Sequence, residues 1–299
     1  MGSNRNFKLV GNEYFFAFLA IIFWGTVATA FKISLSFISV YQLLAISTLS
    51  SFLILLIILT IQRKINLFIK QSQKDWIRSA LLGFINPFLY YIILFNAYFR
   101  LPAQEAMILN YSWPLVLTFL SAIFLKQTIK LKSIIALFIS FLGIVVISTK
   151  GNLLELHFAN PMGVVLALGS AFVWSIFWIL NLQDKREAVI KLASFFLFGT
   201  IFSNILNLYI GYYHLFVIQG VFSSIYVGLF EMGITFVLWL KALIIAQRAD
   251  KISQLIYITP FLSLLIISLI LKEAIQISSF LGLILIISGI IINFHSKKE

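Results

Sequence analysis

The sequence predicts an all-α membrane protein of ten transmembrane helices, arranged as two five-helix repeats of opposite orientation. Composition is the first observation: 61% of the residues are hydrophobic and 11% are charged, whereas a soluble domain has about 25% charged residues. Second, apolar runs of about 20 residues, the length that crosses a bilayer, follow one another along the chain. Third, the second half of the chain repeats landmarks of the first. No stretch remains for a soluble domain.

Charged or turn-forming residues separate the apolar runs. The expected helices cover residues 13–33, 38–60, 76–98, 103–125, 131–149, 161–181, 190–211, 219–242, 250–270 and 277–294. The first run follows Arg5 and Lys8, as in a signal peptide. Its length and the spans that follow favour a retained helix over a cleaved leader.

The distribution of Lys and Arg predicts the orientation in the membrane. With the N-terminus in the cytoplasm, the cytoplasmic segments hold all of the 22 Lys and Arg except Lys32, Arg100, Lys150 and Lys272. This alternation obeys the positive-inside rule and places both termini in the cytoplasm. The net charge of +12 resides in short loops, where it meets lipid headgroups, so we expect a membrane lipid partner and no nucleic acid.

Internal repetition divides the chain into a first repeat at 13–150 and a second at 160–294. A shift of 146 residues superposes Tyr111 on Tyr257, Pro114 on Pro260 and Gly143 on Gly289, and a shift of 145 superposes Gly83 on Gly228 and Asn86 on Glu231. Because each repeat has an odd number of helices, the second enters the membrane upside down. Inverted repeats are typical of alternating-access transporters, whose site lies near the midplane between the halves.

The segment from Asn110 to Pro114 is the strongest site candidate. A proline in a membrane helix leaves a backbone carbonyl without its usual partner one turn earlier, and Tyr111 and Trp113 carry polar edges that suit a cavity better than lipid. Trp24 and Trp174 occupy matched central positions of the first and sixth helices, and Tyr90 is central in the third. We expect these aromatic residues to line an apolar pocket for a small amphipathic solute.

Polar residues within the spans complete the candidate set. Glu231 lies near the middle of the eighth helix and either binds a substrate cation, carries a coupling proton or serves helix packing. The amides of Asn110 and Gln254 bind the substrate or join helices. Asn86 and Tyr257 enter as repeat partners of Glu231 and Tyr111. Glu105, Lys32, Lys272 and Glu273 are expected to reach the interface from helix ends, with Lys32 the exception that could meet substrate charge.

Several chemistries are excluded. The chain has no cysteine and lacks the HExxH, GxSxG and GxxxxGK patterns, and its three histidines fall at expected helix ends or in loops. We therefore expect no enzyme activity, no catalytic residue, no metal site and no cofactor. A non-transporting membrane subunit remains an alternative, and it predicts a dispensable Glu231.

The pattern resembles the drug/metabolite transporter superfamily, whose members contain two EamA-type five-helix units. The resemblance rests on Phe23-Trp24-Gly25, on Pro114 and Pro260, and on Leu271-Lys272-Glu273 followed by Gly282 and Gly289. Within that superfamily, Asn110-Tyr111-Ser112-Trp113-Pro114 and Gly169-Ser170-Ala171-Phe172-Val173-Trp174 resemble segments of YddG-type aromatic amino-acid exporters. The sequence departs from the superfamily at Lys126-Gln127, where an acidic residue is frequent.

This resemblance implies a multi-pass transporter of the bacterial inner membrane that exports amino acids or related small metabolites by alternating access. It implies that Tyr111, Trp113 and Trp174, with Tyr90, line the central cavity. Proton coupling through Glu231 and uncoupled diffusion both fit the sequence. Other solutes of the same superfamily, such as S-adenosylmethionine, a nucleotide sugar or a toxic cation, are the nearest alternatives.

Overall fold

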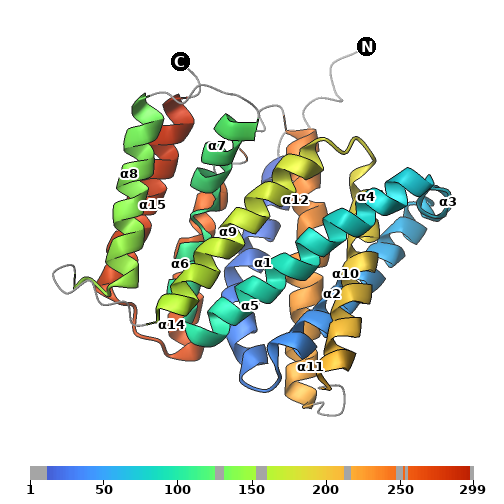
Figure 1. The fold of residues 1–299 in the computed structure, drawn as a ribbon, viewed down its shortest axis with the longest axis horizontal. Coiled ribbons are helices and arrows are strands. Elements are labelled where there is room, and N and C mark those ends of the chain that lie inside the picture. The colour runs from blue at the N-terminus through green and yellow to red at the C-terminus, as the bar shows by residue number, and fades with distance from the viewer. Residues whose placement is uncertain are drawn as a thin grey trace. The chain divides into compact units, whose positions relative to one another are not determined.

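The computed structural model describes residues 12–124, 131–152, 160–211, 217–246, 252 and 255–296. These residues form helices and turns, with no strand among them (Figure 1). Apart from a short helix at Ile65–Ile69, their helical stretches lie where the apolar runs predicted helices. Six of them are long and apolar enough to cross a membrane: Glu13–Leu35, Val40–Ile61, Gln73–Arg100, Pro161–Asn181, Ala188–Ile210 and Ile218–Ile245. Shorter apolar helices cover Ile134–Ile147, Thr259–Leu271 and Ile277–Ile292.

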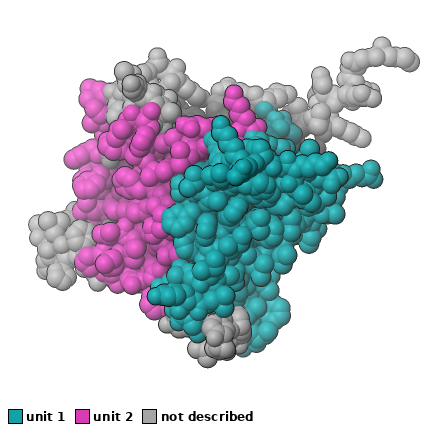
Figure 2. Space-filling view, turned by 45° about the vertical axis from the view of Figure 1, so that its right-hand side comes forward, with its two compact units in different colours: residues 1–88, 186–266 teal, residues 89–185, 267–299 magenta. Residues whose placement is uncertain are grey.

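The chain forms two compact units, coloured teal and magenta in Figure 2. Unit 1 comprises Met1–Phe88 and Arg186–Ile266, and unit 2 comprises Leu89–Lys185 and Ile267–Glu299. Each unit therefore takes segments from both halves of the sequence. The compact units are not the two predicted repeats but mixtures of them.

Unit 1 takes its helices from the start of the first predicted repeat and from the middle of the second. Its elements are α1 (Asn12–Leu35), α2 (Val40–Ile61), α3 (Ile65–Ile69), α4 (Gln73–Gly83), the π-helical η1 (Phe84–Leu89, up to Phe88), α10 (Ala188–Ile210), α11 (Ile218–Val227), the π-helical η3 (Gly228–Gly233), α12 (Ile234–Ile245), the 3₁₀-helical η4 (Leu255–Ile258) and the start of α14 (Thr259–Leu271). Helix α2 packs against α10, and α1 packs against α11 and α12.

Irregular segments interrupt two long helical stretches at matched sequence positions: η1 is a kink with Asn86 extended before Pro87, and η3 is a wide helical turn. The stretch Gln73–Arg100 passes from α4 through η1, and the stretch Ile218–Ile245 passes from α11 through η3 to α12. Segment η1 holds Asn86 and η3 holds Glu231, the two residues that the 145-residue shift superposes. The ranges predicted as single helices at 76–98 and 219–242 are therefore each composite.

These irregular segments pack closely on neighbouring helices through glycines. A methyl group on Gly83 would lie 2.5 Å from the carbonyl oxygen of Phe195 in α10, and one on Gly228 would collide with the carbonyl oxygen of Ser47 in α2. Close approach allows Ser51 Oγ to donate to the carbonyl oxygen of Gly228 at 2.7 Å. The two contacts thus pair the third-helix region with α10 and the eighth-helix region with α2.

Unit 2 contains α5 (Tyr90–Arg100), α6 (Ala103–Asn110), α7 (Trp113–Phe124), α8 (Leu131–Ser148), α9 (Pro161–Leu182), α15 (Ile277–Ser296) and the end of α14. Helix α9 contacts α5, α6 and α7, and α8 lies along α15 (Figure 1). Asn160 caps α9 by accepting the Gly163 N–H at 2.9 Å, and Pro161 takes the first helical position, where a missing N–H costs little.

The contact between α8 and α15 has a two-fold character. A methyl group on Gly143 would lie 2.7 Å from the carbonyl oxygen of Gly282, and one on Gly289 would lie 2.5 Å from the carbonyl oxygen of Ala136. Ala136 and Gly282 are separated by 146 residues, as are Gly143 and Gly289. Each contact is therefore the image of the other when the two helices exchange places.

Candidate functional site

The fourth predicted helix is broken at Tyr111 and Ser112. Helix α6 ends at Asn110, α7 begins at Trp113, and Pro114 is its second residue. The turn is closed by the Ser112 N–H, which donates to the carbonyl oxygen of Leu109, and by the Leu115 N–H, which donates to that of Ser112. The sequence placed one helix at 103–125, and the structure corrects this to two, because Pro114 cannot donate the next helical hydrogen bond.

A related change occurs in the ninth predicted helix. There the 3₁₀ turn η4 ends at Ile258 and runs directly into α14, which begins at Thr259 with Pro260 as its second residue. The helix type of the predicted range 250–270 thus changes just before its proline. Tyr257 lies in η4, while Gln254 lies outside the described residues.

A chain of polar side chains fastens the break in unit 2 to its neighbours. Tyr90 Oη of α5 donates to Asn110 Oδ1 at 3.4 Å, and Asn110 Nδ2 donates to Ser170 Oγ of α9 at 2.9 Å. Three residues after Asn110, the carbonyl oxygen of Trp113 accepts a hydrogen bond from Ser175 Oγ of α9 at 3.0 Å. The Asn110 amide, predicted either to bind substrate or to join helices, joins helices in this structure, where amides are common adhesives between membrane helices.

Aromatic rings surround this polar chain. The Trp174 ring lies 4.8 Å from the Tyr90 ring, 6.5 Å from the Trp113 ring and 5.9 Å from the Trp178 ring, measured between centroids. The planes of Trp113 and Trp174 meet at 72° and so form two walls of a corner. We call Tyr90, Trp113, Trp174 and Trp178 the unit 2 aromatic cluster. Tyr111, Trp113 and Trp174 are half-buried, so they do not belong to a fully enclosed core.

A second group of predicted residues lies in unit 1. Trp24 Nε1 of α1 donates to the backbone carbonyl oxygen of Glu231 at 3.3 Å. Thr26 Oγ1 and Tyr226 Oη share a hydrogen bond of 2.7 Å between α1 and α11. The wide turn η3 disturbs regular backbone pairing around Glu231, and Trp24 satisfies one of its carbonyl groups. The Glu231 side chain is half-buried.

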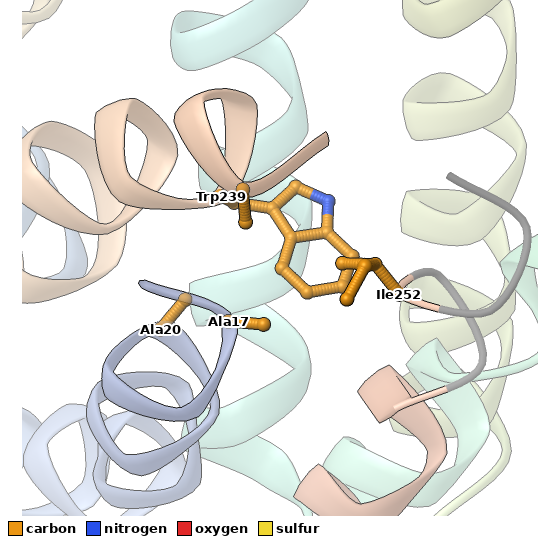
Figure 3. Close-up of a cluster of buried hydrophobic side chains, with 5 residues drawn as sticks. Ala17, Ala20, Trp239 and Ile252 are labelled. Atoms are coloured by element: carbon orange, nitrogen blue, oxygen red, sulfur yellow. The ribbon is translucent and has the colours of Figure 1, made fainter. Parts of the chain in front are cut away.

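Trp24 also packs on a hydrophobic cluster, shown in Figure 3. The indole of Trp239, 8% exposed, lies beside Ile252 and the small side chains of Ala17 and Ala20 of α1. The Trp24 ring contacts that of Trp239 at 5.5 Å and that of Phe236 at 5.9 Å. Trp24 is therefore anchored on one side by packing and on another by its hydrogen bond.

Asn86 occupies an unusual place in η1. Its backbone is extended, with φ −147° and ψ 122°, inside an otherwise helical stretch before Pro87. The side chain is 3% exposed, and its Oδ1 atom has no hydrogen-bond partner among the described residues. A buried polar atom without a protein partner is costly. Lys32, in the last turn of α1, is half-buried.

Sequence reasoning missed several residues of these two groups. Ser170, Ser175, Thr26 and Tyr226 form the interhelical hydrogen bonds. Only Ser170 had a signal in the sequence, its place one helical turn before Trp174. The expectation that Glu105 reaches the interface is wrong, because this side chain is 2% exposed. The described residues contain no group of three His, Cys, Asp or Glu placed to hold a metal ion.

Known proteins place the chain in a family. The profile of the EamA-like transporter family matches residues 11–149 and again residues 161–294. The uncharacterized transporter YvbV of Bacillus subtilis is 25% identical over 288 residues, covering 95% of this chain and 92% of that protein. An uncharacterized transporter of Archaeoglobus fulgidus is 24% identical over 288 residues, covering 92% and 95%.

Two further similarities agree. An uncharacterized transporter of Clostridium kluyveri is 29% identical over 182 residues, and the chain spans 58% of the length of that relative. A solved crystal structure superposes with a TM-score of 0.66 at 19% identity, covering 94% of this chain and 95% of that one, which shows a shared fold. The two profile matches together cover most of the sequence, and the chain is accordingly a multi-pass membrane protein of the EamA-like transporter family, within the drug/metabolite transporter superfamily.

Proposed function

We propose that the protein is a ten-helix transporter that moves amino acids or related small metabolites outward across the bacterial inner membrane. In this proposal, residues 13–150 and 160–294 form two inverted repeats. Two structural observations support this proposal: the exchange symmetry of the α8–α15 contact, and the matched irregularities of the helices before Pro114 and Pro260. Interrupted helices at corresponding places of two halves are a frequent mark of transporter binding sites.

The observation that carries the proposal is the unit 2 aromatic cluster at a helix break. A π-face binds an aromatic or apolar side chain, and the buried Tyr90 hydroxyl, bonded to Asn110, holds the cluster in place beside the break. Half-burial of Tyr111, Trp113 and Trp174 leaves part of each ring available. An amphipathic solute of amino-acid size suits such a wall.

The remaining predicted residues receive roles in the same cycle. Glu231 binds the amino group of the substrate or a coupling proton, and Lys32 meets negative charge. Trp24 positions Glu231 through its backbone carbonyl. Asn86 supplies a buried amide oxygen, and Tyr257 and Gln254 are further proposed substrate-binding residues. Alternating opening of the site to the two sides, driven by rocking of the repeats, would move the solute with or without protons.

The test is uptake of labelled amino acids into proteoliposomes by wild-type protein and by Trp113→Ala. Trp76→Ala is the matched control, because Trp76 packs in unit 1 against Phe68 and Phe198, at ring distances of 5.4 and 6.0 Å, away from the cluster. The proposal expects saturable uptake that Trp113→Ala loses and Trp76→Ala keeps. Equal uptake by all three proteins contradicts the assigned site. If no amino acid is taken up, the amino-acid substrate is refuted and S-adenosylmethionine, nucleotide sugars and toxic cations are tested next.

A further inference from the structure

Helix α6 is a short rigid segment with a joint at each end. Its residues Ala103–Leu109 are all buried, so it is enclosed on every side within unit 2. Before it, Leu101 and Pro102 are non-helical, and after it the chain breaks at Tyr111 and Ser112. Because the connections at both ends are not helical, α6 can shift as a body without unwinding its neighbours.

The first turn of α6 is fastened to the loop that precedes α15. Glu273 Oε1 accepts the Ala103 N–H at 3.2 Å. Gln104 Nε2 donates to the carbonyl oxygen of Ala274 at 3.0 Å, and Gln104 Oε1 accepts the Gln276 N–H at 3.3 Å. These bonds are made by Ala103 and Gln104 and do not involve the Glu105 side chain.

Glu105 adds a charged contact to the same turn. Its side chain is 3% exposed, and Lys150 Nζ lies 3.9 Å from Glu105 Oε1, while the Lys150 side chain is 45% exposed. The separation is that of an ion pair and exceeds a hydrogen-bond length. A carboxylate this deeply buried stays ionised only with a nearby cation, and the cation here can be hydrated as soon as it is released.

Few other charged groups surround Glu105. Helix α9, which packs on α6, has no titratable residue between Pro161 and Leu182. Helix α5 carries Tyr90, Tyr91, Tyr98 and Arg100, and Arg100 Nη1 donates to Asn96 of its own helix at 2.9 Å. Helices α8 and α15 carry Lys132 and His295, the loop before α15 carries Lys272 and Glu273, and the turn after α8 carries Lys150. Lys150 is thus the cation that the structure pairs with Glu105.

We propose that Glu105 is a proton-binding site that locks and unlocks α6 during transport. Binding of one proton converts the carboxylate to a neutral acid, and the ion pair with Lys150 is lost. The start of α6 then keeps the contacts of Ala103 and Gln104 but loses this charged contact, so the segment shifts more readily. The opposite end of α6 carries Asn110, which holds the break beside the unit 2 aromatic cluster, so movement of α6 opens or closes that cluster.

This inference rests on the proposed function for its role in transport. In the proposed topology α6 begins on the outer side of the membrane, so the proton enters from outside. The coupling site is then separate from Glu231, which is free to meet the substrate. The chain contains no cysteine, which permits a test of the lock that does not depend on the substrate.

The first experiment measures thiol accessibility in the full-length protein. Met107→Cys places a single thiol in α6 at a position that is 3% exposed. Its reaction with a membrane-permeant maleimide is followed at acidic and at neutral pH. Because maleimide reacts with the thiolate, each rate is divided by that of the same thiol in the unfolded protein at the same pH. The proposal expects this relative rate to be higher at acidic than at neutral pH, and expects Glu105→Gln, which mimics the protonated acid, to make it high at both. The same pH dependence with and without Glu105→Gln overturns the proposal, as does slow labelling at all pH values.

The second experiment uses proteoliposomes. Glu105→Gln is expected to keep substrate counterflow and to lose stimulation by a proton gradient. Lys150→Met removes the cation that is paired with Glu105 and is expected to change the pH dependence of transport. Lys272→Met is the control: Lys150 and Lys272 both have positive φ, at 54° and 56°, and the ion pair described here is that of Lys150 with Glu105.

The outcomes separate the two proposals. Stimulation by the proton gradient that survives in Glu105→Gln overturns the proton site. Equal loss of counterflow and of gradient stimulation in a monodisperse Glu105→Gln protein also overturns it, because that result indicates that the Glu105–Lys150 pair has only a structural role. Absence of transport by the wild-type protein overturns the proposed function, and the labelling experiment then decides the lock by itself.

Discussion

Replacing Gly143 by alanine tests the close contact between α8 and α15. The added methyl group would lie 2.7 Å from the carbonyl oxygen of Gly282, 3.0 Å from Ile286 Cγ1 and 3.1 Å from Leu285 Cβ. The carbonyl oxygen and the Cβ atom are fixed by the α15 backbone and cannot turn away. The two helices must therefore separate to admit the methyl group.

The expected magnitude combines two opposing effects. Alanine in place of glycine inside a helix stabilises by about 1 kcal/mol, and overpacking a close contact costs about 1–3 kcal/mol. Since two of the three clashing atoms belong to or adjoin the backbone, we expect the upper part of that range and a net loss of roughly 1–2 kcal/mol. Thermal unfolding of the detergent-purified protein, followed by intrinsic fluorescence, measures this loss as a lower melting temperature.

Two companion variants make the result interpretable. Gly169→Ala is the control, because its methyl group meets only Ile93 Cγ2, at 3.9 Å, and so it is expected to be neutral or stabilising. Gly289→Ala is the image of Gly143→Ala and is expected to destabilise as well. Unchanged stability in Gly143→Ala, or a loss in Gly169→Ala as large as in the other two, would refute the reasoning.

Three further predictions concern the polar contacts. Arg186→Lys removes the guanidinium whose Nη1 donates to Ser79 Oγ at 2.8 Å, and is expected to cost about 1–3 kcal/mol in thermal unfolding, whereas Arg100→Lys, which loses bonds only to its own helix turn, is expected to change little. Asn110→Ala removes bonds to two helices and is expected to lower the free energy of unfolding by about 1 kcal/mol. It is also expected to weaken substrate binding in a titration. Tight binding at reduced stability would show that the substrate site does not need this amide. Trp24→Phe keeps an aromatic ring but loses the bond to the Glu231 carbonyl, so a loss of about 1 kcal/mol is expected, and wild-type melting would show the bond to be dispensable.

The course of the chain through helices could be predicted from the sequence because apolar length and charge alternation are strong signals. The two prolines that marked the fourth and ninth helices indeed stand where the helical backbone changes, as the second residues of α7 and α14. The wide turn at Glu231 could not be predicted, because no residue type encodes a π-helical turn in the way that proline encodes a break. The kink at Asn86 did have a signal in the sequence, since it stands directly before Pro87.

The candidate site was predicted in part. Tyr90, Asn110, Trp113 and Trp174 do lie together in unit 2, since helical spacing and aromatic character are visible in the sequence. The partner of the Asn110 amide was not, because an amide in an apolar helix bonds whichever hydroxyl the fold brings near, here Ser170.

Glu105 shows the opposite failure. Its place near a predicted helix end suggested exposure, but the enclosing contacts come from the turn after α8 and the loop before α15. Both are more than 40 residues away in the sequence. Burial that arises from such distant segments leaves no local pattern.

Equilibrium binding of labelled amino acids to the purified protein tests the central claim most directly. The account predicts saturable binding of at least one amino acid, weakened by about tenfold or more in Trp113→Ala, which corresponds to about 1.4 kcal/mol of lost ring contact, and unchanged in Trp76→Ala. Binding that is equally strong in Trp113→Ala and the wild-type protein would contradict it.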